Sequence, residues 1–447
     1  MTNTTKEGKP PTVPPGAKQG GETRARWAWA EPSVWTERML TALENGVKGG
    51  KWFSLRDKLY APKNLAAAWH RVRSNRGAAG VDGQGIELFG AQAEKYLDEL
   101  HGALKNGRYE PQPVLRRWIP KPGTTKLRPL GIPTVKDRVV QTALRNVLEP
   151  IWENQFVPQS YGFRPGRGCK DALRRVDQLL TAGHVWVVDA DIQSFFDTID
   201  HAVMMTEVEK VVSDGTVLDL VARMLKQRVM DEMKTWRPEK GTPQGAVISP
   251  LMANIYLHPV DVALAGEGFE VVRYADDLVI LCRSEDDARR ALDVLQRAMS
   301  ERKLTLHPEK TRLVDATQPG GFDFLGYHFE CGRRTPRNKS IAKLRDNVRA
   351  RTRRNHGQNL ERIIASLNPV LRGWFEYFKH THLEVFVLID AWVRMRLRSI
   401  LRRRRGQRGA GRGLSNIRWP NAFFAELGLF TMTTAWATAR QSRCGNH

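Results

Sequence analysis

The sequence predicts an α+β fold, in which a mixed central part built around an antiparallel sheet is preceded by helices and followed by a helical, basic C-terminal region. Three observations lead to this prediction. Short apolar runs rich in Val, Ile and Leu alternate with helical patterns over residues 113–330. Residues 34–112 and 360–401 carry apolar residues spaced three and four apart, as amphipathic helices do. Most of the net charge of +23 lies in the last quarter of the chain.

The order of these patterns divides the chain into five predicted parts: 1–25, 26–112, 113–330, 331–402 and 403–447. The first part contains Lys, Pro, Gly and Thr with almost no apolar residues, so we expect a disordered tail. The second part is helical, with helices expected at 34–43, 65–73 and 91–104. The fourth part contains helices over 360–378 and 385–401. Pro369 predicts a kink or a break in the first of these, because proline removes a backbone donor.

The segment Tyr274-Ala275-Asp276-Asp277 lies between two apolar runs, 269–272 and 278–281, which predict a β-hairpin with these four residues at its tip. Two adjacent carboxylates repel each other, and no basic residue is nearer than Arg273. A divalent cation removes that cost, and oxygen ligands at a rigid turn suit Mg²⁺. A lone pair of acids is more often a solvated turn, so a metal site requires a second acidic element.

A second apolar run, 184–190, ends in Asp191 and is followed by two aromatic residues and by a helix start at residues 200–201. Carboxylates at two strand ends can together hold two metal ions about 3.5–4 Å apart, which activate a 3′-hydroxyl and hold a leaving pyrophosphate. Attack on an α-phosphate depends mostly on positioning and charge neutralisation, so acids and metal suffice without a protein nucleophile. Asp189 shares a strand face with Asp191 and is a weaker candidate, because a buried supporting acid would show the same pattern.

Nine motifs follow one another in a fixed order between residues 80 and 327, inside the stretch of roughly 60–430 over which the chain resembles one known family. They are GVDG (80–83), IPKP (119–122), RPLGIP (128–133), SYGFRP (160–165), the segment around Asp191, GTPQG with ISP (241–250), YADD (274–277), PEKT (308–311) and FLGY (324–327). In this order the chain resembles the group II intron reverse transcriptases, also called maturases. The resemblance implies a right-hand polymerase with fingers and palm over 113–330. It further implies a helical thumb and maturase-specific domain over 331–402 and a short DNA-binding region over 403–447.

The resemblance also implies roles for individual residues. Asp191, Asp276 and Asp277 match the catalytic carboxylates that bind two Mg²⁺ ions. Lys121 and Arg128 match finger residues that grip the incoming nucleoside triphosphate, and Lys and Arg are the usual partners of phosphate.

Three further positions match residues around the nucleotide. Gln244 matches a residue close to the nucleotide and template, on a loop whose glycines let the backbone approach closely. Phe195, or Phe196 if the register is shifted by one, resembles the aromatic gate beneath the sugar that excludes ribonucleotides, although an ordinary core aromatic would fit the same pattern. Lys310 resembles the cation near the leaving phosphates.

The net charge is unevenly distributed. From residue 331 to the end there are 25 Lys and Arg against 6 Asp and Glu, a net +19, whereas the preceding part carries 46 against 42. This asymmetry predicts an extension that binds a polyanion. The candidate nucleic-acid-binding residues are Arg394, Arg398, Arg402, Arg403, Arg404 and Arg405. A charge run is more often a solvated face, or could contact an anionic membrane, but no apolar stretch approaches a membrane span and nucleic acid is the better partner.

Cysteine usage and the C-terminal length limit the remaining classes. The four cysteines lie far apart without zinc-ligand spacing, which favours a reducing cytoplasm. No paired cysteines with a His-Asn-His pattern follow the arginine run, so we expect a member of the endonuclease-lacking type that makes no second-strand nick and extends a DNA primer that is already present.

The sequence therefore predicts an RNA-directed DNA polymerase that copies a structured intron RNA into DNA, using deoxynucleoside triphosphates and two Mg²⁺ ions, and that assists splicing of the intron and its insertion into target DNA. The alternatives are another bacterial reverse transcriptase, such as a retron, diversity-generating or defence-associated enzyme, and a maturase that binds RNA and assists splicing without polymerising. The maturase-like helices over 360–400 argue against the first alternative, and the three carboxylates argue against the second. Neither the identity of the intron nor the oligomeric state follows from the sequence.

Overall fold

The computed structural model of the chain describes residues 20–47, 49–120, 127–355 and 357–444. These residues form two compact units. The first unit contains residues 20–120, 127–176 and 190–312, and the second contains residues 177–189 and 313–444. Helices and antiparallel sheets occur together, so the predicted α+β class is confirmed. Within the described residues, no helix combines the length and the apolar character that crossing a membrane would require.

The first unit begins with helices, as the apolar spacing predicts. They are α1 (Gly20–Arg26), α2 (Glu37–Asn45), α3 (Arg56–Leu59), α4 (Pro62–Ser74), α5 (Ile86–Ala91) and α6 (Ala93–Lys105). Residues 20–25, which we expected in a disordered tail, belong to α1, and residues 1–19 lie outside the described part. Helix α4 packs against α7 (Val135–Glu153), where the buried side chain of Asn64 donates to the carbonyl of Ala143 at 3.2 Å and accepts from Asn146 at 2.9 Å.

Four short strands of the first unit form one sheet in the order β2-β1-β4-β5. Strand β1 (Val114–Pro120) pairs antiparallel with β2 (Leu127–Ile132) and parallel with β4 (Val229–Asp231), which pairs with β5 (Lys234–Trp236). Residues 121–126, between β1 and β2, lie outside the described part of the chain.

A second sheet has the order β6-β7-β3-β8, with β3 at Trp186–Asp191, β6 at Glu270–Tyr274, β7 at Asp277–Cys282 and β8 at Arg312–Asp315. Strands β6 and β7 are buried along most of their length, because α12 (Ser249–Gly266) packs against β6 and α13 (Glu285–Glu301) packs against β7. The remaining helices near this sheet are α8 (Cys169–Thr181), α9 (Phe195–Thr198), α10 (His201–Val211) and α11 (Gly215–Leu225). Asp200 caps α10 by accepting from the backbone N–H of Val203, which confirms the predicted helix start.

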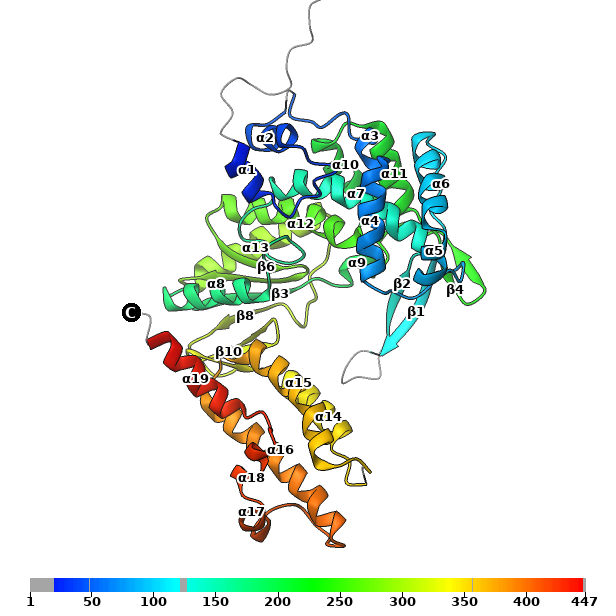
Figure 1. The fold of residues 1–447 in the computed structure, drawn as a ribbon. Helices are drawn as coiled ribbons and strands as arrows, with labels where there is room; N and C mark the ends of the chain where they lie inside the picture. Colours follow the sequence, from blue (N-terminus) through cyan, green and yellow to red (C-terminus); the bar gives the residue numbers. More distant parts are fainter. Residues whose placement is uncertain (1–19, 48, 121–126, 356, 445–447) are drawn as a thin grey trace, which may run out of the picture. The chain divides into compact units, whose positions relative to one another are not determined.

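The second unit contains a small antiparallel sheet and a helical bundle. The strands are β9 (Phe322–Phe324), β10 (Tyr327–Glu330) and β11 (Arg333–Pro336), and the helices are α14 (Asn338–Arg351), α15 (Leu360–Phe378), α16 (Leu383–Arg404), α17 (Leu414–Arg418), α18 (Asn421–Glu426) and α19 (Met432–Cys444). Helices α16 and α19 run side by side (Figure 1). Of the two alternatives predicted at Pro369, the break is wrong, because α15 continues through it, with Leu367 and Leu371 buried in the bundle core on either side, and the kink stays a prediction. Burial of this apolar face outweighs the one backbone hydrogen bond that proline removes.

The buried carboxylate of Asp390 joins α16 to the start of α19. It accepts hydrogen bonds from the backbone N–H groups of Met432 at 3.1 Å and Thr433 at 2.9 Å, and from the Thr433 hydroxyl at 2.6 Å. We expect Asp390→Ala to lower the free energy of unfolding by about 2 kcal/mol, because three donors lose their acceptor. Urea denaturation of the full chain measures this loss, and the exposed Glu384→Ala on the same helix serves as control. An unchanged midpoint for Asp390→Ala would contradict this account of how α19 is attached.

Candidate active site

The predicted hairpin is present, but its turn is tighter than the sequence suggested. Tyr274 at the end of β6 pairs with Asp277 at the start of β7, so only Ala275 and Asp276 form the turn. The backbone of Ala275 has a φ of 60°, a value that two-residue hairpin turns require at the first position and that glycine adopts more readily. The turn therefore stores backbone strain next to the two carboxylates, and neighbouring groups must hold it in place.

The side chain of Arg273 supplies one such support. It is 1% exposed and forms a bidentate ion pair with the equally buried Asp261, with N–O distances of 2.7 and 2.5 Å. Its third nitrogen, Nη1, donates to the carbonyl of Ala275 at 2.9 Å and to Asn254 Oδ1 at 2.9 Å. The planar guanidinium thus binds helix α12 and the strained turn at the same time, which a lysine could not do.

Gly162 supplies a second support from the SYGFRP motif. A Cβ at this position would lie 2.8 Å from the Tyr274 carbonyl carbon, so only glycine allows this close approach to the turn. The amide of Asn254 donates to the Gly162 carbonyl at 2.8 Å and thereby joins this loop to the Arg273 network. The backbone N–H of Tyr161 also donates to the carbonyl of Arg273 at 2.8 Å.

Asp191 lies at the end of β3, as predicted. Its backbone carbonyl accepts from the N–H of His307 at 2.8 Å, and its carboxylate accepts from Lys310 Nζ at 2.7 Å. The segment carrying the PEKT motif is therefore fixed next to this strand end, and the cation of Lys310 partly neutralises Asp191. Both side chains are substantially exposed, so the ion pair can exchange for other partners.

The electrostatics of Asp276 place it near Asp191 and Arg128. Although solvent reaches its side chain, the surrounding protein atoms displace enough water to raise the pKa of the Asp276 carboxyl. The negative charge of Asp191 raises this pKa further, whereas the positive charges of Arg128 and Arg273 lower it. The two carboxylates from different strand ends are thus within electrostatic reach of each other, and the charge of Arg128 of β2 also acts on Asp276.

The donor set of this region fits Mg²⁺ in its chemistry. Two negatively charged carboxylates repel each other, and a cation between them removes this repulsion. Mg²⁺ in proteins is commonly held by one or two carboxylates together with substrate phosphates. Over the described residues, no three His, Cys, Asp or Glu side chains gather closely enough to hold a metal ion without further ligands. Asp277, the third predicted ligand, is exposed at the start of β7.

The two neighbouring phenylalanines differ in exposure. Phe195 is 2% exposed, and its ring packs against those of Tyr256 and Phe196 at centroid distances of 6.3 and 5.2 Å. Phe196 is only half-buried. A side chain that touches a nucleotide sugar needs an open surface, so this burial favours the alternative register, with Phe196 at the surface and Phe195 in the core behind it.

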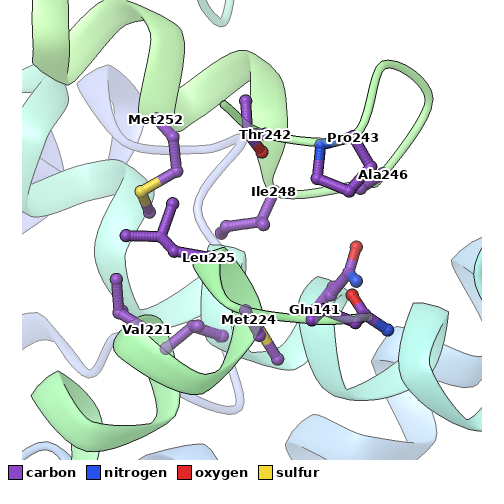
Figure 2. Close-up of a pocket in the computed structure, with 11 residues that line it drawn as sticks. Gln141, Val221, Met224, Leu225, Thr242, Pro243, Ala246, Ile248 and Met252 are labelled. Carbon is purple, nitrogen blue, oxygen red and sulfur yellow. The ribbon is translucent and has the colours of Figure 1, made fainter. Parts of the chain in front are cut away.

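The loop that carries Gln244 lies on a tightly packed floor. Gly245 has a φ of 110°, and a Cβ there would lie 2.6 Å from the carbonyl of Gly131, so the close backbone approach expected of this loop is present. The Gly131 N–H donates to the Gln244 carbonyl at 2.6 Å. Beneath the loop, Leu225 of α11 points toward Ile248 across a cavity of about 10 Å³ (Figure 2). That space is too small for a ligand. The Gly245 approach and the Gly131 hydrogen bond are therefore the contacts that fix the loop.

The remaining predicted residues differ in their surroundings. Lys121 lies outside the described residues. Arg398 is 5% exposed and donates to the Trp419 carbonyl and to Asn421, so it holds the bundle together, and its role in nucleic-acid binding stays a prediction. Arg402 is also used internally, since it donates to Ser415 and to the Arg408 carbonyl. Arg403, Arg404 and Arg405 are exposed, and Arg394 is half-buried.

Comparison with known proteins agrees with the motif order. The family described as "Reverse transcriptase (RNA-dependent DNA polymerase)" matches residues 119–329, and the "Group II intron, maturase-specific domain" matches residues 341–419. The chain belongs to the group II intron reverse transcriptase and maturase family, and by class it is an RNA-directed DNA polymerase.

Individual relatives are similar over different lengths. Protein YkfC of Escherichia coli (strain K12) is 33% identical over 344 residues, which cover 68% of this chain and 85% of that protein. The group II intron-encoded protein LtrA of Lactococcus lactis subsp. cremoris is 37% identical over 205 residues, 45% of this chain and 34% of LtrA. Among solved structures, the one titled "Partial Cas6-RT-Cas1--Cas2 complex" is similar over 55% of this chain and 41% of that chain, with 24% identity and a TM-score of 0.35.

We expect Arg273→Lys to slow DNA synthesis about a hundredfold, because lysine keeps the charge but cannot bind Asp261, Asn254 and the turn together, and small displacements of reacting groups are costly. Affinity for a template–primer duplex should not change, since Arg273 is buried. Single-turnover primer extension measures the rate, and thermal melting checks the fold.

The matched control is Arg175→Lys. Arg175 pairs with Glu270 at 2.7 Å at the opposite end of β6, where both side chains are partly exposed, so this substitution should leave the rate unchanged. A folded Arg273→Lys variant that extends primers at the wild-type rate would show that the turn does not depend on the network.

Proposed function

We propose that the protein copies the RNA of a group II intron into DNA at the site formed by Asp191, Asp276 and Asp277, and that it assists the splicing and mobility of that intron. The observation that carries this proposal is the electrostatic interaction of two carboxylates on strands of one sheet, Asp191 at the end of β3 and Asp276 in the turn between β6 and β7, with the charge of Arg128 also acting on Asp276. The buried Arg273 network fixes the hairpin turn, and the backbone hydrogen bond from His307 to the Asp191 carbonyl fixes the end of β3, so the acids are positioned before any substrate binds.

The protein residues would divide the work as follows. Asp191, Asp276 and Asp277 would hold two Mg²⁺ ions, which when bound activate the primer 3′-hydroxyl and neutralise the charge of the triphosphate. Arg128 would bind phosphate oxygens of the incoming nucleotide with its guanidinium fork, together with Lys121. Lys310 pairs with Asp191 in the free protein. Its ammonium group would leave Asp191 and bind the leaving phosphates. Gln244 would contact the nucleotide and template from its rigid loop.

The second unit would bind structured intron RNA and the template–primer duplex. Its net positive charge and its exposed arginines at the end of α16 support this proposal. Target DNA would be a further polyanionic partner of the same basic region.

Asp276→Asn and Asp191→Asn should each reduce DNA synthesis below a few per cent of wild type, because a neutral amide no longer attracts a cation at the reacting phosphate. Filter binding should give nearly unchanged RNA affinity. Asp286→Asn, which removes an exposed acid of α13, serves as the control and should retain full activity. Substantial polymerisation by Asp276→Asn would exclude this site.

The burial of the two phenylalanines gives a test of the sugar gate. Phe196→Val should raise incorporation of ribonucleotides relative to deoxynucleotides, because the lost ring no longer crowds a 2′-hydroxyl. Phe195→Val should leave this ratio unchanged and lower the free energy of unfolding by about 2 kcal/mol, as expected of a core residue. Competition between the two nucleotide types in primer extension measures the ratio. A response from Phe195→Val alone would restore the original register.

The exposed arginines give a test of RNA binding. Replacing Arg403 and Arg405 with Gln should flatten the dependence of log affinity on log salt by about one to two units, since each neutralised phosphate contributes about 0.7–0.9. The loss should be similar for unrelated RNA sequences, as backbone contacts imply. Arg174→Gln, which removes an exposed charge from α8 of the first unit, is the control and should leave the slope unchanged. An unaltered slope in the double variant would mean that these arginines are only solvated.

A further inference from the structure

A groove in the second unit lies between α16 and the segment that contains α17 and the start of α18. It has a volume of about 670 Å³, within the range of pockets that enclose small ligands. The polar residues that line it are Arg394, Arg398, Arg412, Asn416 and Asn421. Among the described residues that line it, none is acidic, so the groove is suited to a negatively charged ligand.

Specific contacts hold α16 and the segment opposite it in fixed positions on the two sides of the groove. Gly411 lies so close to α16 that a Cβ would be 2.6 Å from the carbonyl of Met395, and its N–H donates to the Ser399 hydroxyl at 2.9 Å. On the other side, Arg398 bridges from α16 to the Trp419 carbonyl and to Asn421 Oδ1, each at 2.9 Å. These contacts fix the two walls relative to α16, so the groove is largely formed before a ligand binds.

The groove offers donors that the protein itself does not use. The Nε–H of Arg394 is buried and, within the described part of the chain, has no hydrogen-bond acceptor. A buried donor without a partner is costly. Because the half-buried Arg394 also lines the groove, an acceptor that enters the groove can approach its guanidinium. Arg412 and Asn416 are exposed at the rim. An asparagine amide offers both a donor and an acceptor, the combination that a nucleobase edge requires.

One wall is apolar. Trp392 and Met395 line the groove beside the polar groups. Trp392 is half-buried, and the guanidinium of Arg396 lies 5.6 Å from its ring centroid. A flat aromatic surface next to guanidinium and amide groups suits a nucleobase, whereas phosphate alone would need only the cations.

We propose that this groove binds a single unpaired nucleotide of a structured RNA, a base that a bulge or loop turns out of its helix. The inference rests on the proposed function, because it assumes that the second unit binds RNA. A continuous duplex presents its backbone and keeps its bases stacked, so it cannot fill a hollow of this size, whereas an unstacked base can be stacked and hydrogen-bonded on its edge. The groove therefore recognises the shape of the RNA, and the exposed arginines beyond it bind the charge of any RNA.

The test uses the full chain and an RNA hairpin with one bulged 2-aminopurine, a base whose fluorescence reports its surroundings. Matched probes are the same hairpin without the bulge and the bulged hairpin made of DNA. The variant combines Arg412→Gln with Asn416→Ala. Both residues are exposed at the rim, so replacing their side chains should not disturb the bundle core. Arg403→Gln removes the same charge from α16 outside the groove and serves as control.

Wild-type protein should prefer the bulged RNA over the paired RNA and change the 2-aminopurine fluorescence on binding. The groove variant should lose about tenfold in affinity for the bulged RNA, as loss of a hydrogen bond to a charged group implies, and for the paired RNA no more than Arg403→Gln loses. Arg403→Gln should weaken both equally. Equal binding of the bulged DNA would show that the groove reads the base without the 2′-hydroxyl, which still supports the proposal.

Two results would overturn the inference: an equal loss for bulged and paired RNA, which would make the groove a general phosphate surface, or no loss at all. Primer extension on a plain oligonucleotide template is measured in parallel. If extension is normal and bulge selectivity is absent, the groove proposal fails alone. If wild-type protein neither extends primers nor binds RNA, the proposed function fails.

Discussion

Inside the first unit, the guanidinium of Arg273 binds Asp261, Asn254 and the carbonyl of Ala275, and the position of the hairpin turn depends on these contacts. A buried arginine without its carboxylate would cost several kcal/mol, so the pair is kept only where its geometry is satisfied on every side. The strained backbone at Ala275 needs such an anchor, because nothing in its own residue type favours a positive φ. The position of the turn that carries Asp276 is therefore set by a network of buried residues.

The charged groups at the surface of the site can exchange one binding partner for another. Asp191 pairs with a lysine that solvent can reach, and Asp276 has a raised pKa because it is crowded by protein atoms and by Asp191. Both carboxylates therefore lie where a cation could replace or add to their present interactions. The buried contacts supply the positions, and the exposed contacts can be replaced by substrate and cation without disturbing the fold.

Local sequence patterns predicted the helices and strands, whereas tertiary contacts determine which side chains are buried and which networks they form. The hairpin, the strand ending at Asp191 and the helices over 360–378 and 385–401 follow from apolar spacing alone, and the structure confirms them. The Arg273 network could not be predicted, because its members are separated in the chain and only the fold brings them together. For the same reason the sequence could not tell the buried Phe195 from the more exposed Phe196, nor the structural Arg398 from the exposed Arg403. The motif order could point to Gly162, but not to the turn that requires it.

The central claim is that Asp191 and Asp276 hold the catalytic cations. It is tested most directly by a crystal structure of the protein with a template–primer, a non-hydrolysable deoxynucleotide and Mn²⁺. Anomalous scattering locates the Mn²⁺ ions in this structure. The account predicts two anomalous peaks about 4 Å apart that contact both carboxylates and the triphosphate, with Lys310 no longer bound to Asp191. Peaks bound elsewhere in a correctly assembled complex, with the Lys310–Asp191 pair intact, would contradict it.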